Sequence, residues 1–291
     1  MHPADQFPHL LQRVLNAPLA LRLDKAEIVL AALAQRLGTP ITLNGRNLAL
    51  DGDDGLDIGP EAEETPKGYD LVGGKIAVIY VAGTLVHKLG SLRPWSGMTG
   101  YNGIRANLNA ALDDNRVKGI VLDVDSPGGE CAGCFDLADT IFAARKEKPI
   151  WAICSESAYS AGYALASAAS KVIVPRTGGV GSIGIICMHV DLSRGLSKAG
   201  IAVTLLKYGD NKDNFAETAP LSKKAFDAAM ADINTMGAMF DALVARNRGI
   251  AAAKVKSYQA GTFMGARGQA AGLADAIMPP DRALREFLKT L

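Results

Sequence analysis

Apolar residues change their spacing repeatedly along the chain between residues 76 and 187. Short continuous apolar runs, typical of strands inside a parallel sheet, alternate with segments whose spacing or composition favours a helix. This alternation predicts an α/β fold with right-handed crossovers and a mostly parallel sheet. The predicted strands are 76–81, 117–124, 150–154, 171–174 and 184–187, and the predicted helices are 101–112, 161–169 and the segment with Phe135, Leu137, Ala138 and Ile141.

The pattern changes on the N-terminal side of this region. Residues 1–50 are predicted to be a helical arm, with one amphipathic helix over 25–34. Residues 51–70 are acidic, contain Gly and Pro and have few apolar anchors, which predicts a linker. Residues 71–291 then form the main domain, and the arm is an appendage for oligomerisation or docking.

Two more elements are predicted near the C-terminal side. The run 203–207 predicts a strand, and the segment from Ser222 to about Arg246 predicts a long helix. Apolar residues of that helix keep a spacing of three or four and form one stripe. Such a stripe is more typical of a core or a subunit contact than of a cofactor site.

Composition excludes several classes of protein. Lys and Arg number 31 and Asp and Glu 30, so the net charge gives no reason to expect nucleic acid or a membrane surface as a partner. No segment approaches the ~20 apolar residues of a membrane span. The N-terminus lacks the features of a secretory signal, which predicts a cytoplasmic protein.

Cysteines do not predict a metal site. Cys131 and Cys134 have C-x-x-C spacing, but a zinc site needs about four ligands and no second pair follows. We therefore expect small buried cysteines and neither a metal nor a cofactor.

Ser160 is the first candidate for chemistry. It follows the strand 150–154 and precedes the small-residue helix 161–169, so its hydroxyl lies at a helix N-terminus. Unpaired N–H groups there favour a developing negative charge. The alternative is that Ser160 only caps the helix, which is a common function of serine.

Gly128 and Gly129 follow another predicted strand, in a turn over Asp125–Glu130. Their bare backbone allows a close approach, and one of their N–H groups could converge with that of Ala161 on a carbonyl oxygen. The alternative is a tight turn without a further role. A phosphate-binding loop is disfavoured because neither nucleotide-binding fingerprint is present.

A serine nucleophile needs a base, and two residues are candidates. His189 is one, but no Asp is placed to orient it. Lys212 is the other, because it lies in a loop after the strand 203–207 and a desolvated amine can accept a proton. A lysine in such a loop is usually a solvated one.

Four ordered motifs resemble the signal-peptide peptidase A family of serine peptidases. These are Asp123–Gly129, Ser157–Tyr163, Gly181–Gly184 and Lys212, and the intervals from Ser160 to the last two match the family's. The resemblance covers about residues 75–280.

The family resemblance implies a crotonase/ClpP-like spiral of β-β-α units and a Ser–Lys dyad. Ser160 would attack a peptide bond, Lys212 would take its proton after burial keeps the amine neutral, and Ser182 would orient the lysine. Gly128 or Gly129, with Ala161, would hold the oxyanion. A homo-oligomer, small residues around the scissile bond, and no metal or cofactor are also implied.

Within the family, the chain looks most like bacteriophage head-maturation proteases. The missing membrane anchor and the segments 94–99 and 148–152 carry this likeness. It implies phage scaffold, capsid or portal proteins as partners, in the host cytoplasm or the procapsid interior. Alternatives are a soluble housekeeping peptidase, an inactive structural or scaffold-interacting relative, and an acyl-CoA binder on the same fold.

Overall fold

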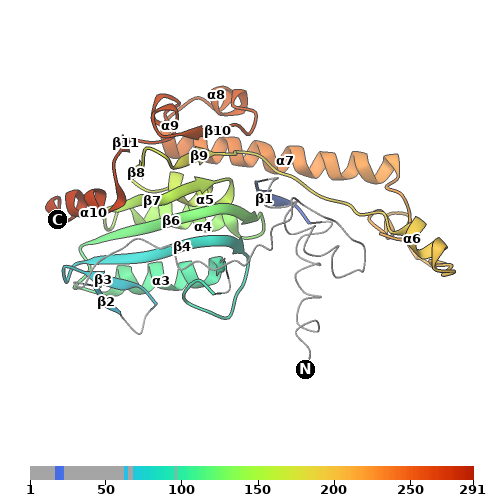
Figure 1. Ribbon diagram of the computed structural model, residues 1–291, viewed down its shortest axis with the longest axis horizontal. Coiled ribbons are helices and arrows are strands. Elements are labelled where there is room, and N and C mark those ends of the chain that lie inside the picture. The colour runs from blue at the N-terminus through green and yellow to red at the C-terminus, as the bar shows by residue number, and fades with distance from the viewer. Residues whose placement is uncertain (1–16, 23–61, 65–67, 96) are drawn as a thin grey trace.

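The computed structural model describes residues 17–22, 62–64, 68–95 and 97–291. Their strands belong to one sheet, and its centre is formed by neighbouring parallel strands (Figure 1). The predicted α/β class with a mostly parallel sheet is confirmed, as the crotonase/ClpP-like resemblance implies. The central strands are β4 (Ile76–Val86), β6 (Gly119–Glu130), β7 (Ile150–Tyr159) and β8 (Lys171–Val174).

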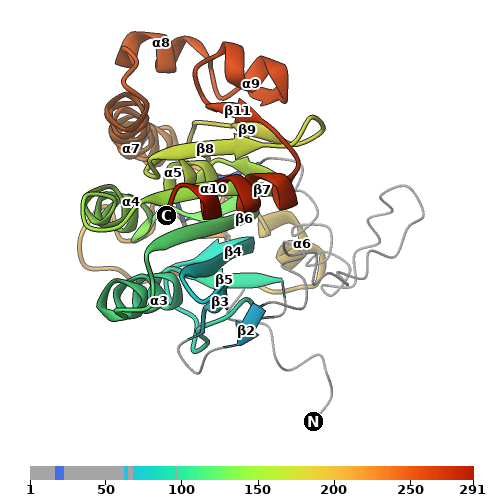
Figure 2. The same ribbon diagram turned by 90° about the vertical axis from the view of Figure 1, so that its left-hand side faces the viewer.

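Helices cover both faces of the sheet, following the alternation of side chains along each strand. Ile79 and Val81 of β4 belong to the larger core, on the face covered by α3, α4 and α5. Val78 belongs to the smaller core on the opposite face, under α10, where Trp151 stacks on Phe287 with ring centroids 4.9 Å apart (Figure 2). The bounds of these helices are α3 (Tyr101–Asp113), α4 (Cys134–Ala144), α5 (Ala161–Ser167) and α10 (Pro280–Lys289).

The long helix α7 (Lys223–Arg248) confirms the prediction for this segment. Ser222 caps it by accepting a hydrogen bond from the N–H of Ala225 at 3.1 Å. Its C-terminal half packs on the core through Phe240, whereas its N-terminal half extends past the sheet with Phe226 exposed (Figure 1). Among the helices of the described residues, none is both long and apolar enough to cross a membrane.

Short elements complete the described chain. β1 lies antiparallel to β6, and β3 lies antiparallel to β4 and to β2. β9 and β10 extend the sheet beyond β7. The bounds are β1 (Leu19–Leu21), β2 (Ala62–Glu64), β3 (Asp70–Val72), β5 (Met98–Gly100), β9 (Gly179–Gly181), β10 (Thr262–Met264), β11 (Ala276–Ile277), α6 (Ser193–Lys198), α8 (Ala252–Ser257) and α9 (Ala266–Ala270).

Three predicted elements differ in the structure. The turn expected at Asp125–Glu130 is the end of β6, because this stretch pairs with β4 on one edge and β1 on the other. The strand predicted at 184–187 is reduced to a bridge between Ile186 and Leu19. Residues 203–207 are exposed and form no strand. The helix predicted over 25–34 lies outside the described residues.

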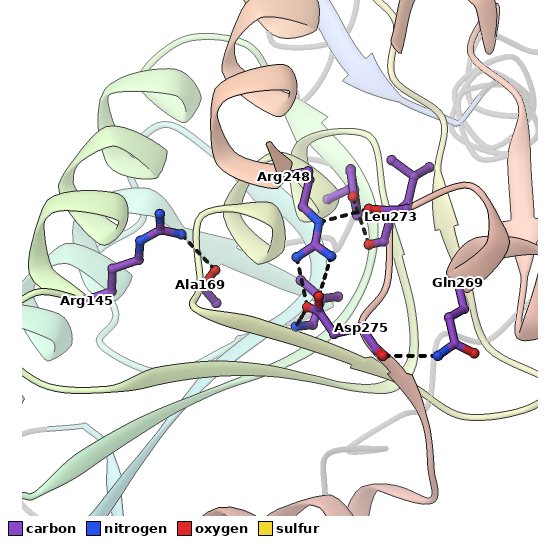
Figure 3. Close-up of polar contacts among 9 residues, drawn as sticks. Arg145, Ala169, Arg248, Gln269, Leu273 and Asp275 are labelled. Atoms are coloured by element: carbon purple, nitrogen blue, oxygen red, sulfur yellow. Dashed lines mark hydrogen bonds and ion pairs between the residues drawn. The ribbon is translucent and has the colours of Figure 1, made fainter. Parts of the chain in front are cut away.

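One polar cluster anchors the C-terminal segments to the helix that follows Ser160. Tyr163 of α5 donates a hydrogen bond to the carbonyl of Leu273 at 2.8 Å. Two residues on, Asp275 accepts two hydrogen bonds from the Arg248 guanidinium, at 2.8 and 2.9 Å, and one from the N–H of Val172 at 2.7 Å (Figure 3). Burial alone would raise the pKa of Asp275, but these hydrogen bonds outweigh it and lower that pKa.

Replacing Asp275 with Asn should therefore destabilise the fold by about 2 kcal/mol, because the Arg248 side chain, only 7% exposed, loses its counter-charge. A carboxylate with a lowered pKa stabilises the fold above its ordinary value of 3.8, and this stability is lost as the pH falls through the lowered value. Urea unfolding at neutral pH should show the full difference between wild type and Asp275→Asn, and unfolding in acid should show a smaller one. A difference independent of pH would contradict the ion-pair explanation.

Candidate active site

Ser160 occupies a sharp turn between β7 and α5. Its backbone has φ +51° and ψ −118°, a conformation that residues with a side chain seldom adopt. The turn is held on both sides, because the N–H of Ser160 donates to the Gly181 carbonyl at 2.8 Å and its own carbonyl accepts from Ala164 at 2.9 Å. Neighbouring structure thus determines a strained conformation at the predicted nucleophile.

The Ser160 hydroxyl is buried and has no hydrogen-bond partner among the described residues. Ser160 is 1% exposed, and its Oγ does not cap α5. The alternative that Ser160 serves as a helix cap is therefore wrong. A buried hydroxyl without a hydrogen-bond partner destabilises the fold. Such a group at a strained turn is typical of a functional site.

Gly128 of β6 approaches Ser160 so closely that no side chain fits between them. A β-carbon built on Gly128 would lie 2.9 Å from Cβ of Ser160, and φ at Gly128 is +112°. The N–H of Gly128 donates to Oγ of Ser126 at 3.1 Å, and this hydroxyl donates to the Gly83 carbonyl at 2.7 Å. Because the Gly128 N–H is engaged on the β4 side, Gly129 is the better-placed oxyanion donor.

Gly129 pairs with β1 on the edge of β6 nearest Ser160, opposite Ala20. Flanking bonds join Arg22 N to Pro127 O at 3.1 Å and Cys131 N to Pro18 O at 3.3 Å. Hydrogen-bonded pairs alternate along an antiparallel ladder, so Gly129 and Ala20 form the bonded pair between them. The N–H of Gly129 therefore points out of β6 on the Ser160 side.

Ala161 contributes the second predicted donor. It is the first residue of α5 and is fully buried, and the N–H groups of a first helical turn have no acceptor within their own helix. Its carbonyl accepts a weak hydrogen bond from the Cys134 thiol at 3.8 Å. The structure thus brings Gly128, Gly129, Ser160 and Ala161 together, and the catalytic roles of these residues stay predictions.

Two acidic residues of β6 hold the strand that leads to Ser160. The Ser155 hydroxyl donates to the buried carboxylate of Asp123, and the N–H of Ser157 donates to Asp125 at 3.2 Å. These contacts lock the register of β7 against β6 where the two strands diverge. Neither carboxylate was predicted to have a role, although both lie in the motif Asp123–Gly129.

Ser182 lies next to the nucleophile through the backbone. It follows Gly181 of β9, which pairs with Tyr159 of β7. The N–H of Ser182 donates to the Gly261 carbonyl at 2.9 Å. Its φ is +54°, so this serine too is held in an unusual conformation.

Lys212 is not beside Ser160 within one chain. It is exposed and belongs to the segment between α6 and α7, and that segment lies beyond the sheet and away from α5 (Figure 1). The burial expected for it is therefore not found in a single chain. His189 is directed elsewhere, with Nε2 at 3.4 Å from the Ala219 carbonyl.

Three of the four cysteines, Cys131, Cys134 and Cys154, are buried as predicted, whereas Cys187 is half-buried. None of the four forms a disulfide, and burial raises the pKa of the Cys131 and Cys134 thiols to about 12. Such thiols are poor nucleophiles and poor metal ligands. In the part of the chain that the structure describes, no cluster of His, Cys, Asp or Glu is arranged to hold a metal ion.

Backbone strain at Ser160 can be measured with two variants that both lack the hydroxyl. Gly should relieve ~1–3 kcal/mol of strain, which exceeds the ~0.4–1 kcal/mol that its flexibility costs through the unfolded state. We expect Ser160→Gly to be more stable than Ser160→Ala by about 1 kcal/mol in urea unfolding, because φ is positive there. Higher stability of the Ala variant would show that the turn is not strained.

Comparison with known proteins identifies the family of the chain. Residues 143–290, which include Ser160, match Peptidase family S49. The chain is 37% identical over 284 residues to the head-tail preconnector protein GP5 of Enterobacteria phage P21, across 95% of this chain and 56% of that protein. It is 36% identical over 284 residues to the capsid assembly protease C of Escherichia phage lambda, across 94% of this chain and 63% of that protein.

A more distant relative is protease 4 of Haemophilus influenzae, 29% identical over 211 residues, across 71% of this chain and 33% of that protein. The chain spans less than two thirds of the length of either phage relative. The family match covers half of the chain and includes the strained serine. The chain therefore belongs to Peptidase family S49.

Proposed function

We propose that the chain is a serine endopeptidase in which Ser160 attacks the carbonyl carbon of a peptide bond. The observation that carries this proposal is the buried Ser160 hydroxyl, which has no partner and sits on a strained turn. The N–H groups of Gly129 and Ala161 flank it. Donors placed in advance around a developing oxyanion are usually the largest electrostatic contribution to acyl transfer.

The base is Lys212 of a neighbouring subunit. Within the described residues, Ser160 has no base beside it, whereas Lys212 is exposed on a segment that projects from the domain. The same segment exposes large apolar side chains, with Leu206 93% and Tyr208 99% exposed. A second copy of the chain would cover this apolar segment and bring its amine into a closed cleft.

Assembly of this kind completes the reaction with the chain's own groups. Lys212 takes the Ser160 proton while Oγ bonds to the substrate carbonyl carbon, and the oxyanion rests on Gly129 and Ala161. When the C–N bond breaks, Lys212 returns the proton to the leaving amine. Water then hydrolyses the acyl ester and regenerates Ser160. Ser182, which follows the residue whose carbonyl accepts from the Ser160 N–H, would orient the incoming amine.

The substrates we propose are phage scaffold, capsid or portal proteins, cut in the host cytoplasm or inside the procapsid. Support comes from the names of the two phage relatives, a head-tail preconnector protein and a capsid assembly protease. A housekeeping peptidase is less favoured, because the match to protease 4 is weaker and covers less of the chain.

Single substitutions test the catalytic assignment. Ser160→Ala and Lys212→Ala should each lower peptide hydrolysis by at least ~10³-fold, because members of one catalytic unit are not additive. His189→Ala should keep the wild-type rate. Loss of activity in the histidine variant, with activity retained in the lysine variant, would identify an imidazole base instead.

Mixing the two inactive variants tests whether the dyad forms between subunits. Random 1:1 assembly of Ser160→Ala with Lys212→Ala chains joins an intact serine to an intact lysine at about one interface in four. We therefore expect about a quarter of the wild-type rate after the variants are unfolded and refolded together. No recovery in mixed oligomers of confirmed composition would place both residues of the dyad in one chain, or show that the protein is inactive.

A further inference from the structure

β1 is an extended strand bonded on both edges, and one of those edges is the end of β6 that approaches Ser160. One edge runs antiparallel to β6, with Leu19, Ala20 and Leu21 opposite Glu130, Gly129 and Gly128. On the other edge, Leu19 and Ile186 exchange both backbone hydrogen bonds, each 2.8 Å long. Peptides bound by strand addition make this pattern of main-chain contacts.

The strand places one peptide carbonyl at the site of catalysis. The β-carbon position built on Gly128 lies 2.1 Å from the Ala20 carbonyl oxygen and 2.9 Å from Cβ of Ser160. The Ala20 carbonyl oxygen and Cβ of Ser160 are therefore no farther apart than the sum of these two distances. Because Ala20 and Gly129 form a bonded pair, this oxygen faces the proposed oxyanion donor. The bond presented to Ser160 is Ala20–Leu21.

Side chains of the strand fit the cleft as well as the backbone does. Leu19 and Leu21 are buried and pack against Ile186 and Met188. Ala20 has 0% exposure, so a long or charged side chain at this position would be forced into the packed interior. The Arg22 guanidinium lies over the Tyr159 ring, 4.7 Å from its centroid. Tyr159 is the residue that precedes Ser160.

We propose that residues 18–22 are an internal substrate-like strand that closes the peptide-binding groove. The inference deepens the proposed function, because it rests on this groove being the one in which Ser160 meets its substrates. A substrate can enter only when the strand leaves. The apparent affinity for a substrate is therefore the intrinsic affinity of the open groove multiplied by the fraction of chains whose groove is open.

Two substitutions should open the groove by different routes. Ala20→Glu places a charged side chain where no space exists, and Leu19→Pro removes the N–H that bonds to the Ile186 carbonyl. Ala20→Ser is the matched control, since a hydroxyl adds little volume. All are made in the full chain with Ser160→Ala, so that nothing is cut, and their folding is checked by thermal unfolding.

The probe is a labelled peptide with the sequence of residues 18–22, Pro-Leu-Ala-Leu-Arg, and its binding is measured by fluorescence anisotropy. We expect Ala20→Glu and Leu19→Pro to bind the probe at least ~10-fold more tightly than the Ser160→Ala parent, and Ala20→Ser to bind it like the parent. Equal affinity in folded Ala20→Glu, Leu19→Pro and parent chains would overturn the proposal.

A second measurement needs no change in the strand. In the Ser160→Ala chain, the Leu19 amide should exchange slowly with solvent, and saturating probe should speed its exchange by releasing the strand. Unchanged slow exchange at saturation would show that the probe and β1 do not share the groove. This result is decisive even if a β1 variant fails to fold.

Hydrolysis separates this inference from the proposed function. Chains with Ser160 intact, with or without Ala20→Glu, are assayed on an unrelated short peptide. Probe binding that responds as expected, with no hydrolysis by any chain, would refute the peptidase and leave the occluding strand standing. Hydrolysis that depends on Ser160, with probe affinity unaffected by Ala20→Glu and Leu19→Pro, would refute the strand alone.

Discussion

The close approach of two backbones, at Gly128 and Ser160, is the constraint on which the rest of the site depends. A β-carbon at residue 128 would lie only 2.9 Å from that of Ser160. Such proximity requires glycine in β6 and an abrupt change of direction after β7. The bond from Ser160 N to Gly181 O then holds that change of direction against the neighbouring strand. The proposed nucleophile and the proposed oxyanion donors are therefore positioned by the same contact.

Small side chains and neutral hydroxyls allow this proximity to extend along α5. Every residue of α5 is buried, and a β-carbon on Gly162 would lie 2.9 Å from Cβ of Ser126. The helix therefore packs almost directly on the β6 backbone. Ser126 and Tyr163 satisfy carbonyls on either side of the helix without placing a charge in the core. The tight packing transmits the position of β6 to the reactive hydroxyl.

Local signals account for what could be predicted from sequence. Strand and helix spacings in the domain are strong, and the strand–serine–helix order predicted around Ser160 is confirmed. The stretch Asp125–Glu130 was expected to be a turn because Pro and Gly are turn residues. It is a strand because both of its edges find partners, one of them distant in sequence. β1 was missed for a similar reason, since Leu19–Leu21 is too short to show a period.

Lys212 illustrates the other limit on sequence reasoning. Motif spacing predicts which lysine accompanies Ser160, but it does not predict in which chain the two meet. The spatial relation depends on surfaces outside the chain, such as the exposed apolar segment before Lys212. Contacts between chains have no counterpart in the periodicity of a single sequence.

The projecting segment between α6 and α7 also bears on when the protein would act. A base delivered by another molecule would make the rate of hydrolysis depend on how often two molecules associate. Hydrolysis would then be slow in a dilute solution. Confinement of many copies in a small shell raises their effective concentration without any chemical signal. Under the proposed function, enclosure in the procapsid would set the time of cleavage, and proteins outside that shell would be spared.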